Sequence, residues 1–270
     1  MCRVADLQQA VLARNDSRAE RLRAELTARG TAVVNLLSSP GSGKTALLEA
    51  ELRLARERGV PAAALTADLA TENDARRLAR SGVPVKQVLT DGLCHLEADM
   101  LAGHLADWLP ADTRLLFVEN VGNLVCPASY DLGESLRVVL ASVTEGEDKP
   151  LKYPTAFGLA QLVVVTKQDL AQAAGFDREA FHANVQQVNP GVEVVDTSVR
   201  SGLNLGVLLE RALAAGDGTA VHRPVMARRA AAGPHTEAHP HGRPYAHGDT
   251  GPHADTAPHA PAEPHAHVQG

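Results

Sequence analysis

The chain has 270 residues, of which 44% are hydrophobic and only 3% aromatic, so we expect one large or two small domains with an aliphatic core. Its net charge of −6 argues against a nucleic-acid-binding surface, which needs clustered basic residues. The N-terminal residues show no apolar signal-peptide core, and no run of about 18 apolar residues predicts a membrane span. The sparse cysteines, Cys2, Cys94 and Cys126, favour a cytoplasmic protein over a disulfide framework.

Apolar stretches of strand length alternate with helical stretches along the chain. An amphipathic pattern predicts a helix over residues 4–29, and further helices are predicted at 44–58, 72–80 and 94–108. The predicted strands are residues 32–37, 61–67, 83–89, 114–120, 137–143, 162–167 and 192–198. Nearly all their residues are apolar, as in a parallel sheet covered on both faces. We therefore predict a doubly wound α/β fold with a mostly parallel sheet.

Composition divides the chain into three predicted parts. Residues 1–30 form a helical segment, and residues 31–216 contain the strand–helix alternation. Residues 217–270 are rich in Pro, Gly, Ala, His and Thr, which cannot bury a core. We therefore predict that this last part is a disordered tail.

A phosphate-binding loop is predicted at "SSPGSGKT" (38–45), between the first strand and the next helix. Glycines in such a loop let backbone N–H groups face phosphates, the lysine reaches the β- and γ-phosphates, and the last hydroxyl binds Mg²⁺. Ser38 replaces the first consensus glycine, and a chance glycine-rich turn is the alternative. The predicted nucleotide-binding residues here are Gly41, Ser42, Gly43, Lys44 and Thr45.

Two carboxylates end predicted strands at the same sheet edge. Asp68 ends the second strand and Glu119 the fourth, where Mg²⁺ would find the oxygen ligands it prefers, together with Thr45. The segment "ENVG" (119–122) stands where GTPases carry D-x-x-G. We expect Lys44, Asp68 and Glu119 to be catalytic, and Asp68, Asp74 or Glu119 to orient the attacking water. Each carboxylate alone is equally well explained as a solvated strand end.

The stretch "TKQD" (166–169) closes a late strand and matches N-K-x-D of GTPases, except that Thr166 replaces Asn. Asp169 would accept hydrogen bonds from N1–H and the exocyclic amine of guanine, a donor pair that adenine lacks. Lys167 would lie along the base. The pattern therefore predicts GTP rather than ATP.

Two thiols and an imidazole are candidate metal ligands. Cys94 and His95 stand at the start of a predicted helix, where the helix N-terminus would lower the thiol pKa. Cys126 follows the predicted γ-phosphate-sensing segment. This ligand set suits Ni²⁺ or Zn²⁺, and a dimer partner would complete the coordination. The alternative is that both cysteines are small buried hydrophobic residues.

Several blocks together closely resemble the HypB family, the P-loop GTPases of the SIMIBI class that help insert nickel into [NiFe]-hydrogenase. These blocks are "NLLSSPGSGKT", "DLATENDARR", "GLCHLEADM", "FVENVGNLVCPASYDLGE", "VTEGEDKPLKYP" and "VVVTKQDL". The resemblance extends over residues 1 to about 215. It implies a homodimeric GTPase with a metal site at the dimer interface, with ligands among Cys94, His95 and Cys126. Because no arginine finger can be assigned in the sequence, we expect slow intrinsic turnover.

The resemblance also implies partners, namely a HypA-like nickel chaperone and the hydrogenase large-subunit precursor. Two other interpretations stay open: a GTPase serving another nickel enzyme such as urease, as UreG does, and a nickel store with vestigial GTPase activity. Some HypB proteins have an N-terminal C-x-x-C-G-C nickel site, of which only Cys2 is present here, because Ala5 and Leu7 replace later thiols.

A histidine-rich tail closes the chain. Six histidines recur every six residues, and two more lie between or beside them. Six residues are two turns of polyproline II, about 19 Å, so periodic histidines share a face but not one ion. We predict several weak, exchangeable nickel sites that act as a buffer and weaken below about pH 6; an inert solubilising tail is the alternative. The predicted ligands are His235, His239, His241, His247, His253, His259, His265 and His267.

Overall fold

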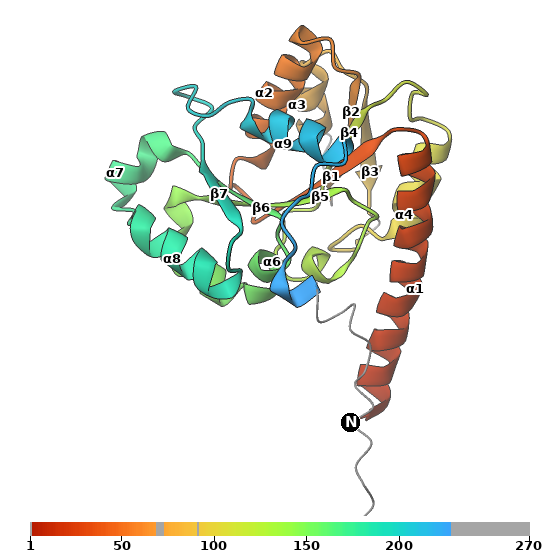
Figure 1. Cartoon of the computed structure of the whole chain (residues 1–270), viewed down its shortest axis with the longest axis horizontal. Coiled ribbons are helices and arrows are strands. Elements are labelled where there is room, and N and C mark those ends of the chain that lie inside the picture. The colour runs from red at the N-terminus through yellow and green to blue at the C-terminus, as the bar shows by residue number, and fades with distance from the viewer. Residues whose placement is uncertain (1, 69–72, 91, 228–270) are drawn as a thin grey trace, which may run out of the picture. The chain divides into compact units, whose positions relative to one another are not determined.

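A computed structural model describes residues 2–68, 73–90 and 92–227, with side chains from residue 9 onward except that of Asp68. Seven parallel strands within these residues form one sheet in the order β3-β2-β4-β1-β5-β6-β7 (Figure 1). The predicted doubly wound parallel sheet is therefore confirmed. The strands are β1 (Ala32–Ser38), β2 (Ala62–Asp68), β3 (Val85–Leu89), β4 (Leu115–Glu119), β5 (Leu136–Ser142), β6 (Leu162–Thr166) and β7 (Glu193–Asp196).

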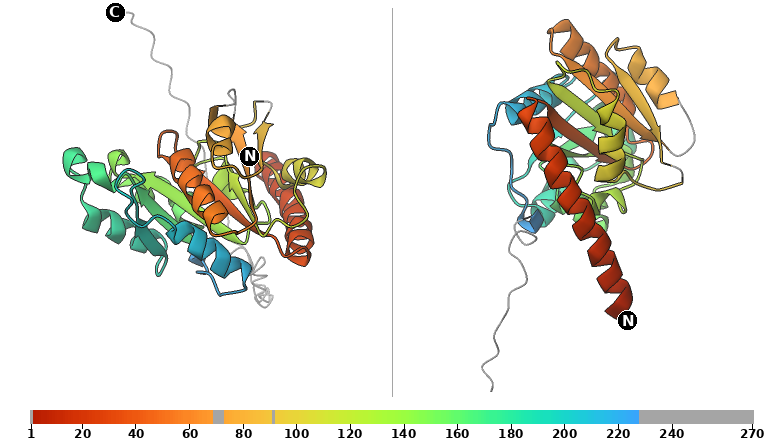
Figure 2. Two further views of the ribbon diagram at one scale, coloured as in Figure 1. Left: turned by 90° about the horizontal axis from the view of Figure 1, so that it is seen from above. Right: turned by 90° about the vertical axis from the view of Figure 1, so that its right-hand side faces the viewer.

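Helices lie on both faces of the sheet (Figures 1 and 2). Those of the described residues are α1 (Cys2–Ala28), α2 (Lys44–Glu57), α3 (Asn73–Ala79), α4 (Ala98–Ala106), α5 (Lys149–Lys152), α6 (Pro154–Gly158), α7 (Ala171–Ala174), α8 (Arg178–Val188) and α9 (Val207–Gly216). Three 3₁₀ turns accompany them: η1 (Pro127–Ser129), η2 (Val143–Glu145) and η3 (Gln168–Leu170). None of the helices in this part of the chain is long and apolar enough to cross a membrane.

Alternation along the strands divides the core between the two faces. Val34 and Leu36 of β1 point toward α2, α3 and α9, whereas Val33 and Leu37 point to the opposite face. On that opposite face, α1 and α4 pack on one half of the sheet and α6 and α8 on the other. Because both faces are covered by apolar side chains, most strand residues are apolar, as the sequence indicated; Asn35 of β1 and Arg137 of β5 are buried exceptions.

The strand register brings the predicted site segments to one edge. Leu36 of β1 pairs with Glu119 of β4, and Ser38 pairs with Leu140 of β5. Ser142 of β5 pairs in turn with Thr166 of β6. The loops that follow β1, β4 and β6 therefore start at adjacent positions, where ligands bind in open α/β sheets.

One predicted helix boundary is wrong. The helix predicted to start at Cys94 begins at Ala98, and Glu97 before it has an extended backbone (φ −108°, ψ 156°). The Ala98 N–H donates 2.9 Å to Asn15 Oδ1 on α1. A side chain far away in sequence thus satisfies a donor in the first turn of α4, so no local capping signal marks this start.

Candidate functional site

The loop between β1 and α2 has the backbone of an anion-binding loop. Gly41 and Gly43 have positive φ angles of 74° and 92°, which glycine adopts without the strain that a Cβ would add. Lys44 is the first residue of α2, so the N-terminus of this helix faces the loop. Free N–H groups and the helix dipole together make such a terminus a site for phosphate.

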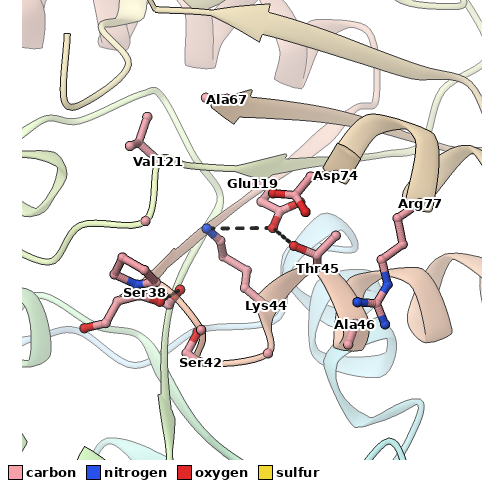
Figure 3. Close-up of a pocket in the computed structure, with 15 residues that line it drawn as sticks. Ser38, Ser42, Lys44, Thr45, Ala46, Ala67, Asp74, Arg77, Glu119 and Val121 are labelled. Atoms are coloured by element: carbon pink, nitrogen blue, oxygen red, sulfur yellow. Dashed lines mark hydrogen bonds and ion pairs between the residues drawn. The ribbon is translucent and has the colours of Figure 1, made fainter. Parts of the chain in front are cut away.

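Lys44, Thr45 and Glu119 meet above this loop (Figure 3). Lys44 Nζ donates 2.5 Å to the Asn120 carbonyl and lies 3.8 Å from Glu119 Oε1. Thr45 Oγ1 donates 2.6 Å to the same Glu119 oxygen. Burial raises the pKa of Glu119, while the Lys44 charge and the Thr45 hydrogen bond lower it.

The donor set at Glu119 fits a small divalent cation. Glu119 is 2% exposed, and its Oε2 has no hydrogen-bond partner among the described residues. A buried carboxylate oxygen without a partner is costly, and a cation would satisfy it. The adjoining Thr45 hydroxyl is a second oxygen ligand of the kind Mg²⁺ prefers. Asp68 ends β2 at the same edge, but its side chain lies outside the described residues.

A cavity of about 490 Å³ opens over these groups. Residues 38–46, Ala67, Asp74, Arg77, Glu119, Val121 and Gly122 line it. Asp74 and Arg77 belong to α3. The Arg77 guanidinium donates 2.8 Å to Glu49, so in this state it is held at the rim (Figure 3).

A second cavity, of about 280 Å³, adjoins the first at Gly43 and contains the predicted base-binding residues. Lys167, with a positive φ of 60°, donates 2.6 Å from Nζ to the Gly41 carbonyl. Asp169 Oδ1 accepts 2.6 Å from the hydroxyl of Ser198, which fixes the orientation of the carboxylate. The two cavities thus offer a phosphate end and a base end for one nucleotide.

Thr166 has a contact of its own with the phosphate-binding loop. Its hydroxyl donates 2.5 Å to the Ser42 carbonyl. The residue that departs from N-K-x-D therefore still joins β6 to the loop. Sequence reasoning missed Ser198, although its place two residues after the end of β7, in "DTSVR", was a signal that could have found it.

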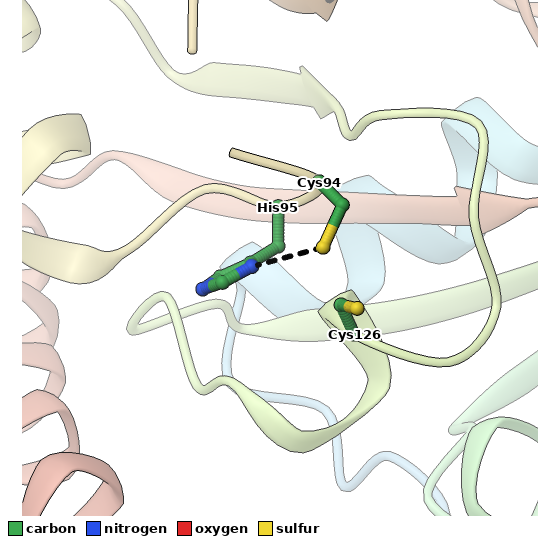
Figure 4. Close-up of side chains that lie close together, drawn as sticks. All are labelled: Cys94, His95 and Cys126. Carbon is green, nitrogen blue, oxygen red and sulfur yellow. Dashed lines mark hydrogen bonds between the residues drawn. The ribbon is translucent and has the colours of Figure 1, made fainter. Parts of the chain in front are cut away.

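Cys94, His95 and Cys126 form one cluster (Figure 4). One potential ligand atom from each lies within 4.8 Å of the others, and Cys94 Sγ is 3.7 Å from His95 Nδ1. His95 is 8% exposed, its Nε2 lies 3.6 Å from Glu97, and its ring packs 3.9 Å from that of Tyr130, centroid to centroid. The predicted ligands are thus brought together, with His95 Nδ1 turned toward the thiols.

The predicted cause of thiol activation at Cys94 is wrong. Cys94 lies in the loop before α4, so no helix N-terminus acts on it. Its pKa is raised rather than lowered, first by the hydrogen bond with Cys126 and then by burial and the second thiol's charge. A metal cation bound between the two thiols would favour their deprotonation, since thiolate is the ligating form.

Asn15 of α1 joins the two segments that carry the thiols. It is 6% exposed, accepts from the N–H of Ala98 at 2.9 Å and donates to the Asp131 carbonyl at 2.8 Å. Ala98 follows the Cys94–His95 loop, and Asp131 follows the Cys126 segment. Sequence reasoning missed Asn15 and Tyr130, because both act through contacts between distant parts of the chain.

The remaining predicted ligands are not described. Cys2 lies in α1, but its side chain is outside the described residues, as are all eight histidines from His235 to His267. Their roles remain predictions.

Residues 32–196 match the model of the CobW/HypB/UreG nucleotide-binding domain. The chain is 47% identical over 204 residues to the hydrogenase maturation factor HypB of Azotobacter vinelandii, covering 76% of this chain and 67% of that protein. It is 44% identical over 192 residues to the hydrogenase/urease maturation factor HypB of Helicobacter hepaticus, covering 70% and 78%.

Solved structures give a similar result. The chain matches the crystal structure of a hydrogenase maturation factor HypB from Archaeoglobus fulgidus with a TM-score of 0.70 and 36% identity, over 76% of this chain and all of that one. It matches HypB from Helicobacter pylori in complex with nickel with a TM-score of 0.67 and 38% identity, over 74% and 95%.

Proposed function

Because the chain belongs to the CobW/HypB/UreG family of nucleotide-binding proteins, we propose that it is a GTPase that carries nickel to [NiFe]-hydrogenase during maturation. One observation carries the proposal: Cys126 of the Cys94–His95–Cys126 cluster lies on the same loop after β4 as Asn120, whose carbonyl contacts Lys44. A metal site and a phosphate site that share one chain segment are suited to a nucleotide-controlled exchange of metal. The nickel complex of the Helicobacter pylori relative supports the choice of ion.

At the phosphate end, the residues act by binding and orientation. N–H groups of the loop around Gly41 and Gly43 surround the phosphates, and Lys44 exchanges the Asn120 carbonyl for phosphate oxygens. Thr45, Glu119 and Asp68 would hold Mg²⁺, which when bound neutralises charge on the phosphates. Water attacks the γ-phosphorus and the bond to the β–γ bridging oxygen breaks, giving GDP and phosphate. Asp68, Asp74 and Glu119 are the candidates for orienting that water.

At the metal end, Cys94, His95 and Cys126 bind Ni²⁺ as two thiolates and one imidazole; Zn²⁺ fits the same donors. Three ligands leave a four-coordinate site incomplete. Leu93 and Val125, 43% and 64% exposed, directly precede the two cysteines and place apolar surface beside the site. A second copy of the chain that covers this surface would bury it and complete the site, so we propose a homodimer.

The proposal includes a cytoplasmic site of action, delivery by way of a HypA-like nickel chaperone to the hydrogenase large-subunit precursor, and the histidine tail as a weak nickel buffer. Slow intrinsic hydrolysis is expected because the Arg77 guanidinium is bound to Glu49 and no other arginine lines the phosphate cavity in the described part of the chain. Hydrolysis would relax the loop after β4 and favour release of nickel.

The urease alternative has a specific observation in its favour, because the Helicobacter hepaticus relative is a hydrogenase/urease maturation factor. The test is complementation of two strains, one lacking its hydrogenase-maturation GTPase and one lacking its urease GTPase. We expect hydrogenase activity to return and urease activity not to. The reverse pattern would assign the chain to urease. Failure to complement either strain would favour a nickel store, if the Lys44→Ala variant still binds nickel as well as the wild type does.

Asp169→Asn is expected to lower kcat/KM for GTP about 100-fold, because the amide is uncharged and sets an NH2 donor against one of the two guanine donors. Activity on xanthosine triphosphate should rise, since the amide can donate to the 2-oxo group of xanthine. Steady-state kinetics with GTP, XTP and ATP measure both effects. Ser198→Ala serves as the matched control and should cost only about 3- to 10-fold, because it removes orientation alone. A wild-type chain that hydrolyses ATP as well as GTP would refute the base assignment.

A further inference from the structure

One face of the sheet carries two apolar clusters, one beneath α1 and α4 and the other beneath α6 and α8. A buried polar cluster lies between them. Its members are Asn35, Glu134 and Arg137, which are 0%, 9% and 9% exposed. Asn35 of β1 stands directly opposite Arg137 of β5 in the strand register. Polar groups this deeply buried need partners, so where their hydrogen bonds lead is informative.

The Arg137 end of the cluster supports the metal site. Arg137 donates 2.5 Å to Glu134 and 2.9 Å to each of the carbonyls of Ala128 and Tyr130. These two carbonyls belong to the segment that follows Cys126, and the Tyr130 ring packs on His95. Burial opposes ionisation of Glu134, yet Arg137 and the Leu132 N–H hold its pKa at about 2, so the pair stays charged and rigid.

Asn35 connects this pair to the nucleotide site. Its Nδ2 donates to Glu134 Oε1 and its Oδ1 accepts from Asn120 Nδ2, both at 3.4 Å. Asn120 Oδ1 in turn accepts 2.9 Å from the Val121 N–H, while the carbonyl of the same peptide accepts from Lys44. The Asn120 side chain and the Lys44 ammonium therefore hold the Asn120–Val121 peptide through its N–H and its carbonyl.

Lys44 would have two alternative partners, the Asn120 carbonyl seen here and the phosphates of a bound nucleotide. A lysine at this position reaches the β- and γ-phosphates when a nucleotide is bound, and its ammonium then leaves the Asn120 carbonyl. The freed Asn120–Val121 peptide would then be able to turn and shift the Asn120 side chain relative to Asn35. The two 3.4 Å contacts of Asn35 are long for hydrogen bonds, so a small shift either tightens or breaks them.

We propose that Asn35 is a positioning residue that couples the phosphate site to the nickel site. It does so by joining the Asn120 peptide to the Glu134–Arg137 pair that supports the Cys126–Tyr130 segment. The inference rests on the proposed function and adds to it the route of coupling. The competing route is the covalent segment from Glu119 to Cys126 acting alone.

The test is a nickel titration of the full chain. Binding is monitored by nickel–thiolate charge-transfer absorption, which reports ions bound to thiols and not ions bound to tail histidines. Affinity is measured with GDP and with a non-hydrolysable GTP analogue, and GTP hydrolysis is measured on the same samples. For the wild type we expect the two affinities to differ at least about fivefold. For Asn35→Leu we expect this ratio to fall below about twofold, with each separate affinity still measurable.

Asn15→Leu is the matched control, because it removes another buried asparagine that supports the thiol segments but has no contact toward Lys44. It should weaken nickel in both nucleotide states and leave the ratio as in wild type. Asn35→Thr, which suits a strand and cannot span the gap, provides a second variant if the leucine disturbs folding.

The outcomes separate the two proposals. A wild type without thiol-bound nickel or without GTP hydrolysis refutes the proposed function, and the coupling with it. A wild type with both but with a ratio near one overturns only the coupling. A wild-type affinity ratio in the Asn35 variants also overturns it, because the route would then lie elsewhere. An equal loss of the ratio in Asn15→Leu overturns it too, because the effect would then be a general loosening of the thiol segments.

Discussion

Lys44→Ala is expected to lower the kcat for GTP hydrolysis by about 10³-fold, the largest effect of any single substitution at the phosphate site. Lys44 is the first residue of α2, is 8% exposed, and projects toward Glu119 and the cavity. A buried ammonium in a site shielded from water stabilises developing phosphate charge more strongly than one at the surface. Steady-state phosphate release with GTP and Mg²⁺ measures the effect.

A second consequence adds to this loss. The Lys44 charge lowers the pKa of Glu119 against the effect of burial. Without the lysine the pKa of Glu119 rises further, so a larger fraction of its side chain is protonated at a given pH and cannot bind a cation. We therefore expect residual activity of Lys44→Ala to increase as the pH rises, because higher pH restores the carboxylate.

Lys149→Ala is the matched control for Lys44→Ala. Lys149 is also buried, at 6% exposure, and donates 2.6 Å to the hydroxyl of Ser39 in the same loop, but it does not line the phosphate cavity. We expect it to retain at least about a tenth of wild-type kcat, since it loses the hydrogen bond to Ser39 and an ion pair with Glu145 but no charge in the phosphate cavity. Equal losses in both variants would show that loop integrity rather than phosphate charge is being measured, and an unaffected Lys44→Ala would support a vestigial GTPase.

The strands were predictable because burial of both sheet faces leaves a continuous apolar signal. β1 reads "AVVNLLS", and its exception, Asn35, marks the polar cluster rather than an error in the strand. The phosphate loop was predictable because its chemistry needs glycines and a lysine at fixed spacing within one segment. In both cases the information is local.

The parts that sequence reasoning missed depend on distant contacts. The start of α4 is set by Asn15, 83 residues away, and no pattern near Cys94 shows it. The same is true of Tyr130 packing on His95. The helix α8 is different, because Asp177 accepts from the Ala180 N–H as a standard N-cap, so its start could have been predicted.

Cys94→Ser and Cys126→Ser are each expected to lower the nickel affinity of the nucleotide-sensitive site by more than about 100-fold. Loss of a group that only orients a metal ligand costs up to about 100-fold, and loss of a ligand itself should cost more. Each substitution removes a soft thiolate from a cluster whose members lie within 4.8 Å of one another. Equilibrium dialysis gives the stoichiometry for the full chain and for a chain that ends at Ala227. The cut is placed there because His222 Nε2 lies 2.8 Å from the buried Asn189 Oδ1, and an earlier cut would remove this contact.

The full chain should bind several weak ions that the shortened chain loses, while both keep one thiol-dependent ion. His95→Ala should weaken binding of that ion, because His95 belongs to the cluster. His104→Ala is its control, because His104 lies on α4 outside the cluster and its substitution should leave the ion in place. Cys2→Ser shows whether the N-terminal thiol contributes. If the shortened chain binds no nickel with GDP or with a GTP analogue, the thiol cluster is not a carrier site, and nickel handling by this protein would reside in the histidine tail alone.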